Sequence, residues 1–328
     1  MDSNPLQDRF GRMHTYLRVS LTDRCNFRCT YCMPEEGVEL TAKEEILTLE
    51  EIETLTRMFV ELGVRKVRLT GGEPTIRKGF LGLVESVANI PDLEGLYLTT
   101  NGLLLTDLAQ PLKQSGLAGI NVSLDSLRQD RFEAITRRPG LERVLSGIKA
   151  ALSAGLNTKI NVVVMPDLNE DEVVDFVRLT KDWAVQVRFI EFMPFLSNGW
   201  QHSRVLTSAE LRTRIQQEVE LVPLGKGPND VATEWTVPGF VGTVGFVSSV
   251  TESFCDGCNR LRLTADGQLK SCLFLPPESD LKGLLRRGAS KQEMINAIRK
   301  TLAGKWAAHP PMDRWQQLDT LAMVQIGG

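Results

Sequence analysis

The sequence predicts an α/β protein, a partial (β/α)6 TIM-like barrel followed by a C-terminal β-rich and α-helical domain. Two observations carry this prediction. From the N-terminus to about residue 200, short β-branched runs alternate with longer amphipathic stretches, which is typical of parallel strands joined by helices. All the cysteines fall in two tight groups, at residues 25–32 and 255–272. We therefore expect a barrel over residues 1–220 and a cluster-binding domain over residues 221–328.

Six strand-and-helix units follow one another along the barrel part of the chain. The predicted strands are Tyr16–Leu21, Lys66–Thr70, Leu96–Thr99, Gly119–Leu124, Thr158–Val164 and Val185–Phe192. The predicted helices are Thr48–Leu62, Phe80–Ala88, Asp107–Gln114, Leu141–Ala154 and Glu170–Lys181. Parallel strands are joined by right-handed crossovers, so the helices would cover one face of the sheet. Six units predict an incomplete barrel, since a closed one has eight.

The two faces of the predicted sheet differ in chemistry. Alternate residues of a strand point to opposite faces, and one set is apolar throughout, from Leu17 and Val19 to Val187. The other set is polar and contains four cations, Arg18, Arg68, Lys159 and Arg188. Buried charge without a partner is costly, so this face predicts a wide, wet cavity that receives an anion. A solvent-facing sheet side is the alternative, and it would suit an antiparallel sheet better.

Polar loops follow the strands at their carboxyl ends. The first cysteine group follows strand one, Gly71-Gly72-Glu73-Pro74 follows strand two, and Thr100-Asn101-Gly102 follows strand three. Leu124-Asp125-Ser126 and Glu191-Phe192-Met193 end two later strands. Barrel enzymes build their active sites from loops at this end. The five loops together therefore predict a site there.

Length and charge limit the partners and the compartment. The chain has 328 residues, is 42% hydrophobic and carries a formal net charge of −3, so we expect neither nucleic acid nor an anionic membrane as a partner. The N-terminal segment is charged and has no apolar core of a signal peptide, and no run approaches the ~20 apolar residues of a membrane span. We expect a cytoplasmic protein, in which cysteines stay reduced.

The spacing of the cysteines favours iron–sulfur chemistry. Cys25, Cys29 and Cys32 form C-x3-C-x2-C, and Cys255, Cys258 and Cys272 form C-x2-C-x13-C. Three thiolates on a [4Fe–4S] cluster leave one iron open for a small molecule. Zinc is the alternative, with His14, His202 or His309 reaching a cysteine group through the fold. Disulfides are less favoured in a reducing compartment.

A hairpin would bring the third cysteine of the second group back to the other two. Asp266-Gly267 is a two-residue hairpin signal between the β-rich segments 239–250 and 260–273, after the point near residue 220 where the parallel pattern stops. Centring the turn there pairs Ala265 with Gln268 and places Leu261 opposite Cys272. Arg260 and Arg262 would then project from one face of the first strand.

Several motifs resemble those of the radical S-adenosylmethionine (SAM) superfamily, and within it the GTP 3′,8-cyclases of molybdenum cofactor biosynthesis. They are TDRCNFRCTYCMP, TGGEP, TTNG, NVSLD, RFIEFM, FCxxCNRLRLTADG and the terminal Gly327-Gly328, and the resemblance runs from about Arg12 to Gly328. The motifs are jointly specific, although each alone is weak.

The resemblance implies two [4Fe–4S] clusters and SAM as cofactors, with the two cysteine groups as cluster ligands. It implies that Tyr31, Gly72, Ser123 and Met193 contact SAM. Arg188 could meet the SAM carboxylate, because guanidinium matches carboxylate geometry. The residues that resemble GTP contacts are Arg18, Arg68, Thr99, Lys159, Arg260, Leu261 and Arg262, with the tail glycines Gly327 and Gly328 beside the reacting centre.

The same resemblance implies a reaction and its partners. A one-electron reductant would start SAM cleavage, a hydrogen atom would leave C3′ of GTP, and the ribose carbon would close onto guanine C8. The dihydro product would go to cyclic pyranopterin monophosphate synthase. The oligomeric state is open, with a homodimer as one option. The alternatives are a radical SAM enzyme that modifies peptides or dehydrogenates its substrate, with an auxiliary cluster, and a non-catalytic iron–sulfur carrier.

Overall fold

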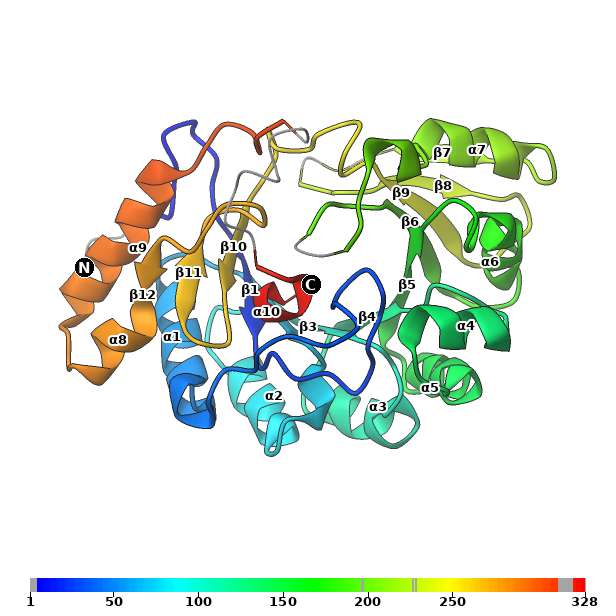
Figure 1. Cartoon of the computed structure of the whole chain (residues 1–328). Coiled ribbons are helices and arrows are strands. Elements are labelled where there is room, and N and C mark those ends of the chain that lie inside the picture. The colour runs from blue at the N-terminus through cyan, green and yellow to red at the C-terminus, as the bar shows by residue number, and fades with distance from the viewer. Residues whose placement is uncertain (1–4, 196–197, 226, 228, 312–320, 328) are drawn as a thin grey trace.

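One continuous sheet of strands organises the molecule. The computed structural model describes residues 5–195, 198–225, 227, 229–311 and 321–327. In this part of the chain the sheet has 12 strands in the order β12-β11-β10-β1-β2-β3-β4-β5-β6-β9-β8-β7. The sheet curves around the short C-terminal helix α10, and the helices that follow the first strands lie on its outer side (Figure 1). The predicted α/β fold with a partial barrel is confirmed.

The six barrel strands lie close to their predicted positions. They are β1 (Tyr16–Ser20), β2 (Lys66–Thr70), β3 (Gly95–Thr100), β4 (Gly119–Ser123), β5 (Asn157–Val164) and β6 (Gln186–Glu191). Neighbours in this series are parallel, as β1 is with β2 and β5 with β6. Each boundary differs from its prediction by at most one residue, because the β-branched runs are bounded by clear turn residues.

The outer helices also follow the predicted pattern, with one addition. They are α1 (Leu49–Glu61), α2 (Phe80–Ala88), α3 (Leu105–Gln114), α4 (Gln129–Thr136), α5 (Leu141–Ser153) and α6 (Val173–Leu179). Short 3-10 turns lie at η1 (Lys43–Glu45), η2 (Pro74–Ile76), η3 (Glu170–Glu172) and η4 (His202–Arg204). Helix α1 begins at a capping box, in which Thr48 and Glu51 satisfy each other's backbone N–H groups. Sequence reasoning missed α4, because its few apolar residues cover only two turns.

The C-terminal segments extend the sheet at both of its sides. They comprise α7 (Ser208–Gln216), β7 (Val222–Gly225), β8 (Thr233–Thr236), β9 (Thr243–Val247), β10 (Arg260–Leu263), β11 (Gln268–Lys270), β12 (Ser279–Asp280), α8 (Leu281–Arg286), α9 (Lys291–Gly304) and α10 (Met323–Ile326). The expectation that parallel pairing stops near residue 220 is wrong, because β9 pairs parallel with β6 and β10 pairs parallel with β1. Local strand–helix alternation cannot reveal the pairing of β10 with β1, since the two strands lie far apart in the sequence.

The predicted turn of the β10–β11 hairpin is wrong by one residue. Arg262 pairs with Lys270, and the backbone N–H of Thr264 donates to Gln268 O at 2.9 Å. Three residues therefore form the loop, and its last residue, Gly267, has φ +82°. A three-residue loop that ends in a left-handed glycine is a common hairpin form and contains the same Asp-Gly pair.

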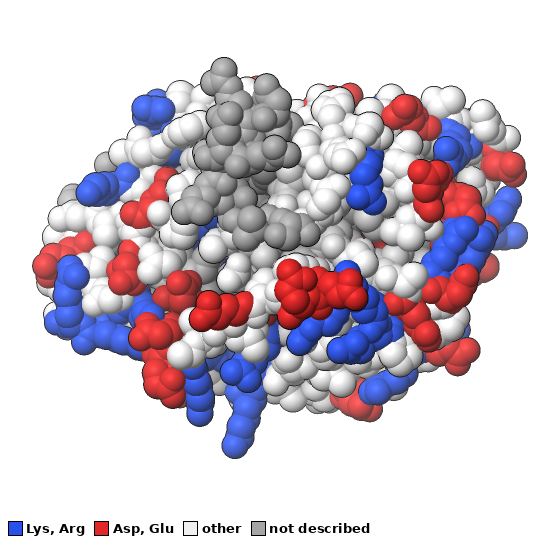
Figure 2. Space-filling model, in the orientation of Figure 1, with Lys and Arg blue, Asp and Glu red and all other residues white. Residues whose placement is uncertain are grey.

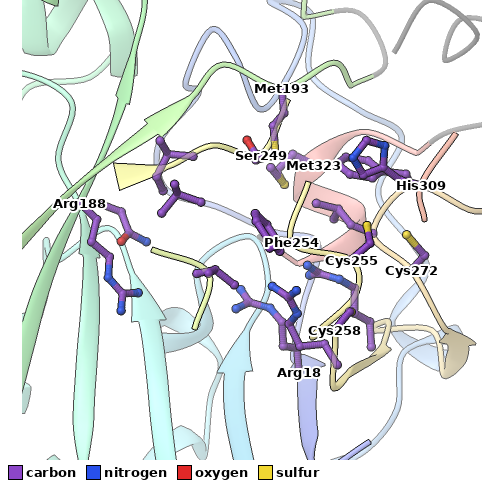
Figure 3. Close-up of a pocket in the computed structure, with 18 of the residues that line it drawn as sticks. Arg18, Arg188, Met193, Ser249, Phe254, Cys255, Cys258, Cys272, His309 and Met323 are labelled. Atoms are coloured by element: carbon purple, nitrogen blue, oxygen red, sulfur yellow. The ribbon is translucent and has the colours of Figure 1, made fainter. Parts of the chain in front are cut away.

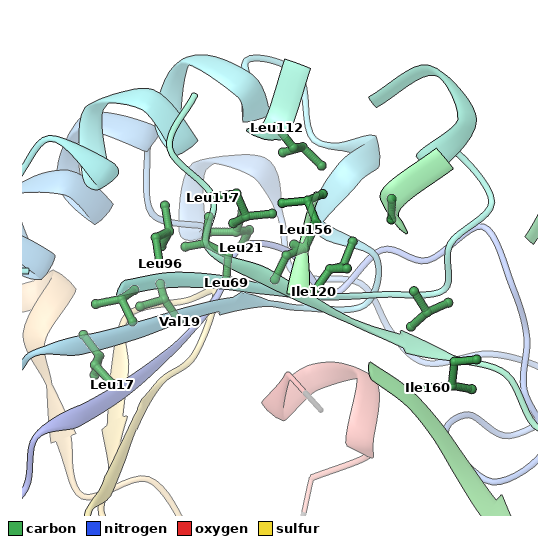
Figure 4. Close-up of a cluster of buried hydrophobic side chains, with 14 of the residues drawn as sticks. Leu17, Val19, Leu21, Leu69, Leu96, Leu112, Leu117, Ile120, Leu156 and Ile160 are labelled. Carbon is green, nitrogen blue, oxygen red and sulfur yellow. The ribbon is translucent and has the colours of Figure 1, made fainter. Parts of the chain in front are cut away.

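The apolar face of the sheet packs under the helices as predicted. Leu17, Val19, Leu69 and Ile160 are fully buried in one large cluster that also receives side chains of α1, α3 and α5. Figure 4 shows this cluster between the strands and the outer helices. The core therefore lies outside the barrel sheet, and the opposite face is left for polar residues. No helix among the described residues is long and apolar enough to span a membrane.

Two helical glycines offer a test of this packing. A Cβ at Gly147 in α5 would lie 2.7 Å from the backbone O of Gly102, whereas a Cβ at Gly82 in α2 would meet nothing within 4 Å. We expect Gly147→Ala to lower the free energy of unfolding by about 1–3 kcal/mol through overpacking. Gly82→Ala should raise it by up to about 1 kcal/mol, because alanine is the better helix former. Thermal unfolding of both variants checks this, and equal effects would contradict the packing.

Candidate functional site

The polar face of the sheet forms the interior of the barrel. Because the strands are parallel and in register, Arg18 lies between Arg68 on β2 and Arg262 on β10. Lys159 pairs with Asn121 and with Gln186 in the same way. Two adjoining cavities open along this face, and they share the side chains of Arg18, Asn121, Asn161, Ile190, Met193 and Met323.

The first cavity surrounds the first cysteine group. Cys25, Cys29 and Cys32 all line it and are half-buried free thiols. The cavity measures about 200 Å³. Burial raises the pKa of Cys25 to about 11 and that of Cys29 and Cys32 further. Thiols in such surroundings remain protonated unless a metal or cation replaces the proton.

A buried tyrosine–aspartate pair fixes the cysteine loop to the sheet. Tyr31 Oη donates to Asp125 Oδ2 at 2.8 Å, and Val163 N donates to Asp125 Oδ1 at 2.8 Å. Burial raises the pKa of Asp125 to about 6, against the opposing effect of these hydrogen bonds. Asn169 adds a link by donating to the backbone O of Asp125 at 2.7 Å. The loop that carries the cysteines is thereby tied to the ends of β4 and β5.

Glu73 of the glycine-rich loop ties together the loops after β1, β2 and β3. Its Oε1 accepts from Thr75 Oγ1 at 2.6 Å and from Thr100 Oγ1 at 2.7 Å, and its Oε2 accepts from Asn101 N at 2.7 Å. Asn101 in turn donates to Asn26 Oδ1 at 2.6 Å, inside the first cysteine group. Burial raises the pKa of Glu73, so the surrounding donors are needed to hold its charge.

Gly72 allows the same loop to pass close to the cysteine loop. Its N–H donates to Thr22 O at 2.6 Å, and the next N–H, of Glu73, donates to Arg24 O at 2.8 Å. A Cβ on Gly72 would lie 2.3 Å from Arg24 O, so glycine is required by close approach.

The second cavity surrounds the second cysteine group, as Figure 3 shows. Cys255, Cys258 and Cys272 line it, and it measures about 210 Å³. Burial opposes ionisation of Cys258, but the charges of Arg260 and Lys305 outweigh it and lower the pKa of this thiol to about 6. A thiolate is the form that binds metal.

His309 reaches this cavity from the segment that follows α9. Its backbone N–H donates to Cys255 Sγ, and its ring packs edge-on against Phe274 at 5.4 Å. Of the histidines considered as zinc ligands, it is the one that lines a cysteine cavity. Within the described residues, no group of three or more His, Cys, Asp or Glu side chains is arranged to hold a single metal ion, as distinct from a cluster of several.

Two cations from outside the second group hold its backbone. Arg12 Nη1 donates to Cys255 O at 2.8 Å, and Arg12 Nε donates to Asp8 Oδ2 at 2.7 Å. Lys305 Nζ donates to Ser271 O, next to Cys272. The N-terminal segment and the end of α9 thus position the cysteines.

Cations crowd the interior between the two cavities and the amino ends of the strands. Burial lowers the pKa of Lys159 to about 8, and the charge of Arg188 adds to this effect. Burial likewise lowers the pKa of Arg188 to about 10 and of Arg262 to about 9, with Arg68 and Arg18 as the next contributors. All of these groups remain charged at pH 7. On the outer surface, by contrast, positive and negative side chains are interspersed on the face that Figure 2 shows.

The C-terminal helix α10 fills the centre of the barrel. Met323 lines both cavities, Val324 lines the first, and Arg262 Nη1 donates to Gly327 O at 3.3 Å. A Cβ on Gly327 would lie 2.6 Å from Thr70 Oγ1 and 2.8 Å from Ser20 Cβ. The predicted tail glycine therefore lies in a crowded place against β1 and β2, whereas Gly328 lies outside the described residues.

The structure brings most of the predicted site residues together. Lining the first cavity are Cys25, Cys29, Tyr31, Cys32, Gly72, Thr99, Ser123 and Met193. Lining the second are Arg18, Arg188, Met193, Cys255, Cys258, Arg260, Arg262 and Cys272. Arg68 is almost fully buried, and Lys159 Nζ donates to Gln186 Oε1 at 2.9 Å, so both belong to the cation cluster behind the cavities.

Two predicted residues lie elsewhere than expected. Arg188, grouped with the SAM contacts, lines the second cavity and not the first. It lies five residues before Met193, which is about 16 Å along an extended strand. The side chain of Leu261 is fully buried in the outer core, because it alternates with Arg260 and Arg262. Its backbone is the part that can face the cavity.

Sequence reasoning missed other residues of the site. Tyr16 and Lys66 share the interior face with Arg18 and Arg68, and continuing the two-residue alternation by one step would have found them. Asp125 was noted at a strand end without a role. The contact of His309 with the second group arises from long-range packing and leaves no local signal.

The residues present fit iron–sulfur clusters and a polar ligand. Each cavity gathers three thiols, the soft ligands that such clusters take. Thr99 Oγ1 and Asn161 Oδ1 are buried at the first cavity and have no hydrogen-bond partner among the described residues. Buried polar atoms without partners are rare and indicate a missing ligand or water.

The chain matches two family models that together cover most of its length. Residues 19–180 match the model described as the Radical SAM superfamily. Residues 185–311 match the model described as Molybdenum Cofactor Synthesis C.

Curated relatives resemble the chain over nearly all of its residues. It is 45% identical to GTP 3′,8-cyclase, mitochondrial, of Arabidopsis thaliana, covering 99% of this chain and 84% of that protein. It is 44% identical to GTP 3′,8-cyclase of Moorella thermoacetica, covering 98% and 100%. Molybdenum cofactor biosynthesis protein 1 of Drosophila melanogaster is 50% identical, covering 94% of this chain and 55% of that protein. The chain thus spans about half the length of this animal relative.

Solved structures at low identity share the fold. Streptococcus suis SuiB aligns with a TM-score of 0.58 at 12% identity, covering 93% of this chain and 68% of that one. Methylornithine synthase (PylB) aligns with a TM-score of 0.54 at 15% identity, covering 90% and 86%. These likenesses concern the fold alone.

Replacing the Glu73 carboxylate tests its role as the anchor of the three loops. We expect Glu73→Gln to lower the free energy of unfolding by about 2 kcal/mol. The amide NH2 of the glutamine would point at N–H and O–H groups that now donate to the carboxylate, so donors would meet donors. Glu53→Gln is the control: Glu53 is partly exposed on α1 and pairs with Arg57 at 2.8 Å, so its effect should stay within about 0.5 kcal/mol. Thermal unfolding measures both, and a Glu73 variant as stable as the control would contradict the anchor.

Proposed function

Because the chain belongs to the GTP 3′,8-cyclase family of the radical SAM superfamily, we propose that it converts GTP into (8S)-3′,8-cyclo-7,8-dihydroguanosine 5′-triphosphate, an early step of molybdenum cofactor biosynthesis. The observation that carries this proposal is the arrangement of the interior. Two cysteine triplets face adjoining cavities, and a cluster of buried cations lies beside them. An electron carrier needs no such cavities, so a carrier function is not favoured.

The first triplet would hold the [4Fe–4S] cluster that binds SAM. Tyr31, Gly72, Ser123 and Met193 line the same cavity, and Thr99 and Asn161 offer polar atoms without partners there. When bound, this cluster and SAM would supply the one-electron chemistry that removes a hydrogen atom from the substrate. An external one-electron reductant is therefore part of the proposal.

The second triplet would hold another [4Fe–4S] cluster, whose open iron faces the nucleotide base. Cys255, Cys258 and Cys272 line a cavity that also contains Arg18 and Arg260. Thiols and cations therefore line one cavity, and Arg260 lies against Cys258. We propose that the base is held at the cluster and that the triphosphate is held by cations.

The buried cations would orient the substrate as well as bind it. All five cations lie on strands of the sheet. Arg18, Arg68 and Lys159 lie on the barrel strands, and Arg260 and Arg262 lie on β10. Five positive groups fixed to strands can hold a triphosphate in one pose, which places the ribose next to the first cavity. We assign Arg188 to this set and no longer to SAM, because it lines the second cavity.

Helix α10 would close the space in which the ribose reacts. Met323 lies against both cavities, and the backbone of Gly327 meets Arg262. A tail in this place excludes water and competing hydrogen donors from the reacting carbon. The product keeps its triphosphate and would be consumed by a further cyclising enzyme, cyclic pyranopterin monophosphate synthase.

Formation of product tests the proposed function directly. The anaerobically reconstituted protein should form a cyclised dihydro product from GTP with SAM and a reductant, but not from ATP, CTP or UTP. Mass spectrometry should show an isomer of GTP together with 5′-deoxyadenosine. Cleavage of SAM without any nucleotide product would favour another radical SAM reaction, such as peptide modification.

Iron content distinguishes the two-cluster arrangement from zinc at the second site. We expect about 8 irons per chain when both clusters are filled. Replacing either cysteine triplet by alanine should leave about half, and loss of the first triplet alone should abolish SAM binding. Iron and zinc analysis after anaerobic reconstitution checks this. Zinc at the second triplet with no iron uptake would contradict the proposal.

Arg188 and Arg262 provide a test of the phosphate assignment. Charge-assisted contacts of buried groups contribute roughly 1.5–3 kcal/mol, so Arg188→Ala and Arg262→Ala should each weaken GTP binding about ten- to hundredfold. SAM binding should be unchanged in both. Arg57→Ala, at an exposed position on α1, is the control. If Arg188→Ala weakens SAM binding and leaves GTP binding intact, the reassignment is wrong.

A further inference from the structure

Tyr16 occupies the amino end of β1 on the interior face, among the cations. The strand register places it beside Lys66 on one side and Arg260 on the other. Its hydroxyl oxygen accepts a hydrogen bond from Arg68 Nε at 2.7 Å and another from the guanidinium of Arg18. In the part of the chain that the structure describes, Tyr16 Oη donates no hydrogen bond.

The groups that face Tyr16 are predominantly positive. Arg18 lies on the same strand, Lys66 and Arg68 come from β2, and Lys66 Nζ lies 4.9 Å from the centre of the Tyr16 ring. Tyr97 on β3 faces the same two β2 cations. The other charged groups of this region are Arg260 and Arg262 on β10, Arg188 on β6, and the carboxylates of Asp230 and Glu234, which act on Lys66, Lys159 and Arg188.

We propose that Tyr16 is a phenolate in the free protein, that it serves as an internal counter-ion for the phosphate-binding cations, and that it takes up a proton when a triphosphate binds. The proposal rests on the proposed function, because it concerns the same cation cluster. It makes Tyr16 a positioning residue, since it holds Arg68 and Arg18 in place for the substrate.

The electrostatics of the site agree with this geometry. Burial opposes ionisation of Tyr16, but the nearby positive charges outweigh it and lower the pKa of the phenol to about 7. Their contributions come, in order of size, from Arg68, Arg18 and Lys66. When phosphate oxygens neutralise these charges, the pKa of the phenol must rise, and the hydroxyl is protonated at neutral pH.

The sign of the pH dependence follows from this linkage. Above pH 7 the free protein must gain a proton to bind, so rising pH weakens triphosphate binding. Between pH 6 and pH 8 this group alone costs about tenfold in affinity. At pH 7.5, binding should be accompanied by uptake of about three-quarters of a proton by Tyr16. The terminal phosphate and Lys159 also titrate near this range. The contribution of Tyr16 must therefore be separated by comparing the wild type with a variant that lacks the Tyr16 hydroxyl.

Tyr16→Phe is the variant that isolates it, and Tyr97→Phe is its matched control. Both tyrosines face Lys66, but the hydroxyl of Tyr16 is the one that binds Arg68. GTP affinity of the cluster-loaded proteins is measured without reductant at pH 6, 7 and 8. The ratio of the Kd at pH 8 to the Kd at pH 6 should be about tenfold larger in wild type and Tyr97→Phe than in Tyr16→Phe. If Tyr16 had a merely structural role, Tyr16→Phe would change the Kd by the same factor at all three pH values.

Calorimetry in buffers of different ionisation enthalpy gives a second readout that needs no variant. Wild-type protein should take up the expected fraction of a proton on binding GTP at pH 7.5, and Tyr16→Phe should lack this contribution. Inorganic triphosphate is used in parallel, so that failure of the guanosine assignment is separated from failure of this proposal. Wild-type binding without proton uptake, or an unchanged pH ratio in Tyr16→Phe, would overturn the role of Tyr16.

Discussion

Repulsion between like charges is the constraint on which the interior of this barrel depends. Arg18, Arg68 and Arg262 lie on three adjacent strands at the same level. The register of the parallel strands fixes their backbones side by side, so the three side chains cannot move far apart. Moving charges out of water is costly, and bringing equal charges together adds to that cost. The sheet tolerates this arrangement because its stability comes from the other face, where the apolar core packs under the helices. An interior with this excess of positive charge favours an anionic ligand over a neutral or cationic one.

The cysteine loops meet a second requirement, which is to hold metal ligands in place before any metal arrives. Buried hydrogen bonds satisfy it at both sites. Glu73 and Asp125 bind the first loop to three neighbouring strand ends. Arg12 and Lys305 bind the second through carbonyl groups next to the ligands. The same groups also act on the thiols through their charge, since Lys305 favours ionisation of Cys258 and Glu73 opposes that of Cys25.

Much of this architecture could be predicted from the sequence, because it follows local rules. Strand alternation gave the apolar face of Leu17 and the polar face of Arg18, and both are confirmed. The pairing of β10 with β1 could not be predicted, because no local pattern encodes a partner in a distant part of the chain. The hairpin turn was misplaced because one Asp-Gly pair is compatible with two- and three-residue loops. Arg188 lines the second cavity, and its assignment to SAM or to the substrate stays a prediction.

The order of strands has a consequence for how the chain is made. Strand β1, at residues 16–20, lies between β2 and β10, and β10 begins only at Arg260. During synthesis one edge of β1 remains unpaired until most of the chain has emerged, and the cationic side chains beside it lack their final surroundings. An unpaired strand edge of this kind is prone to pair with other chains. Closing this edge of β1 therefore requires β10, which lies in the last quarter of the chain, and we expect chains that end before Arg260 to be prone to aggregation.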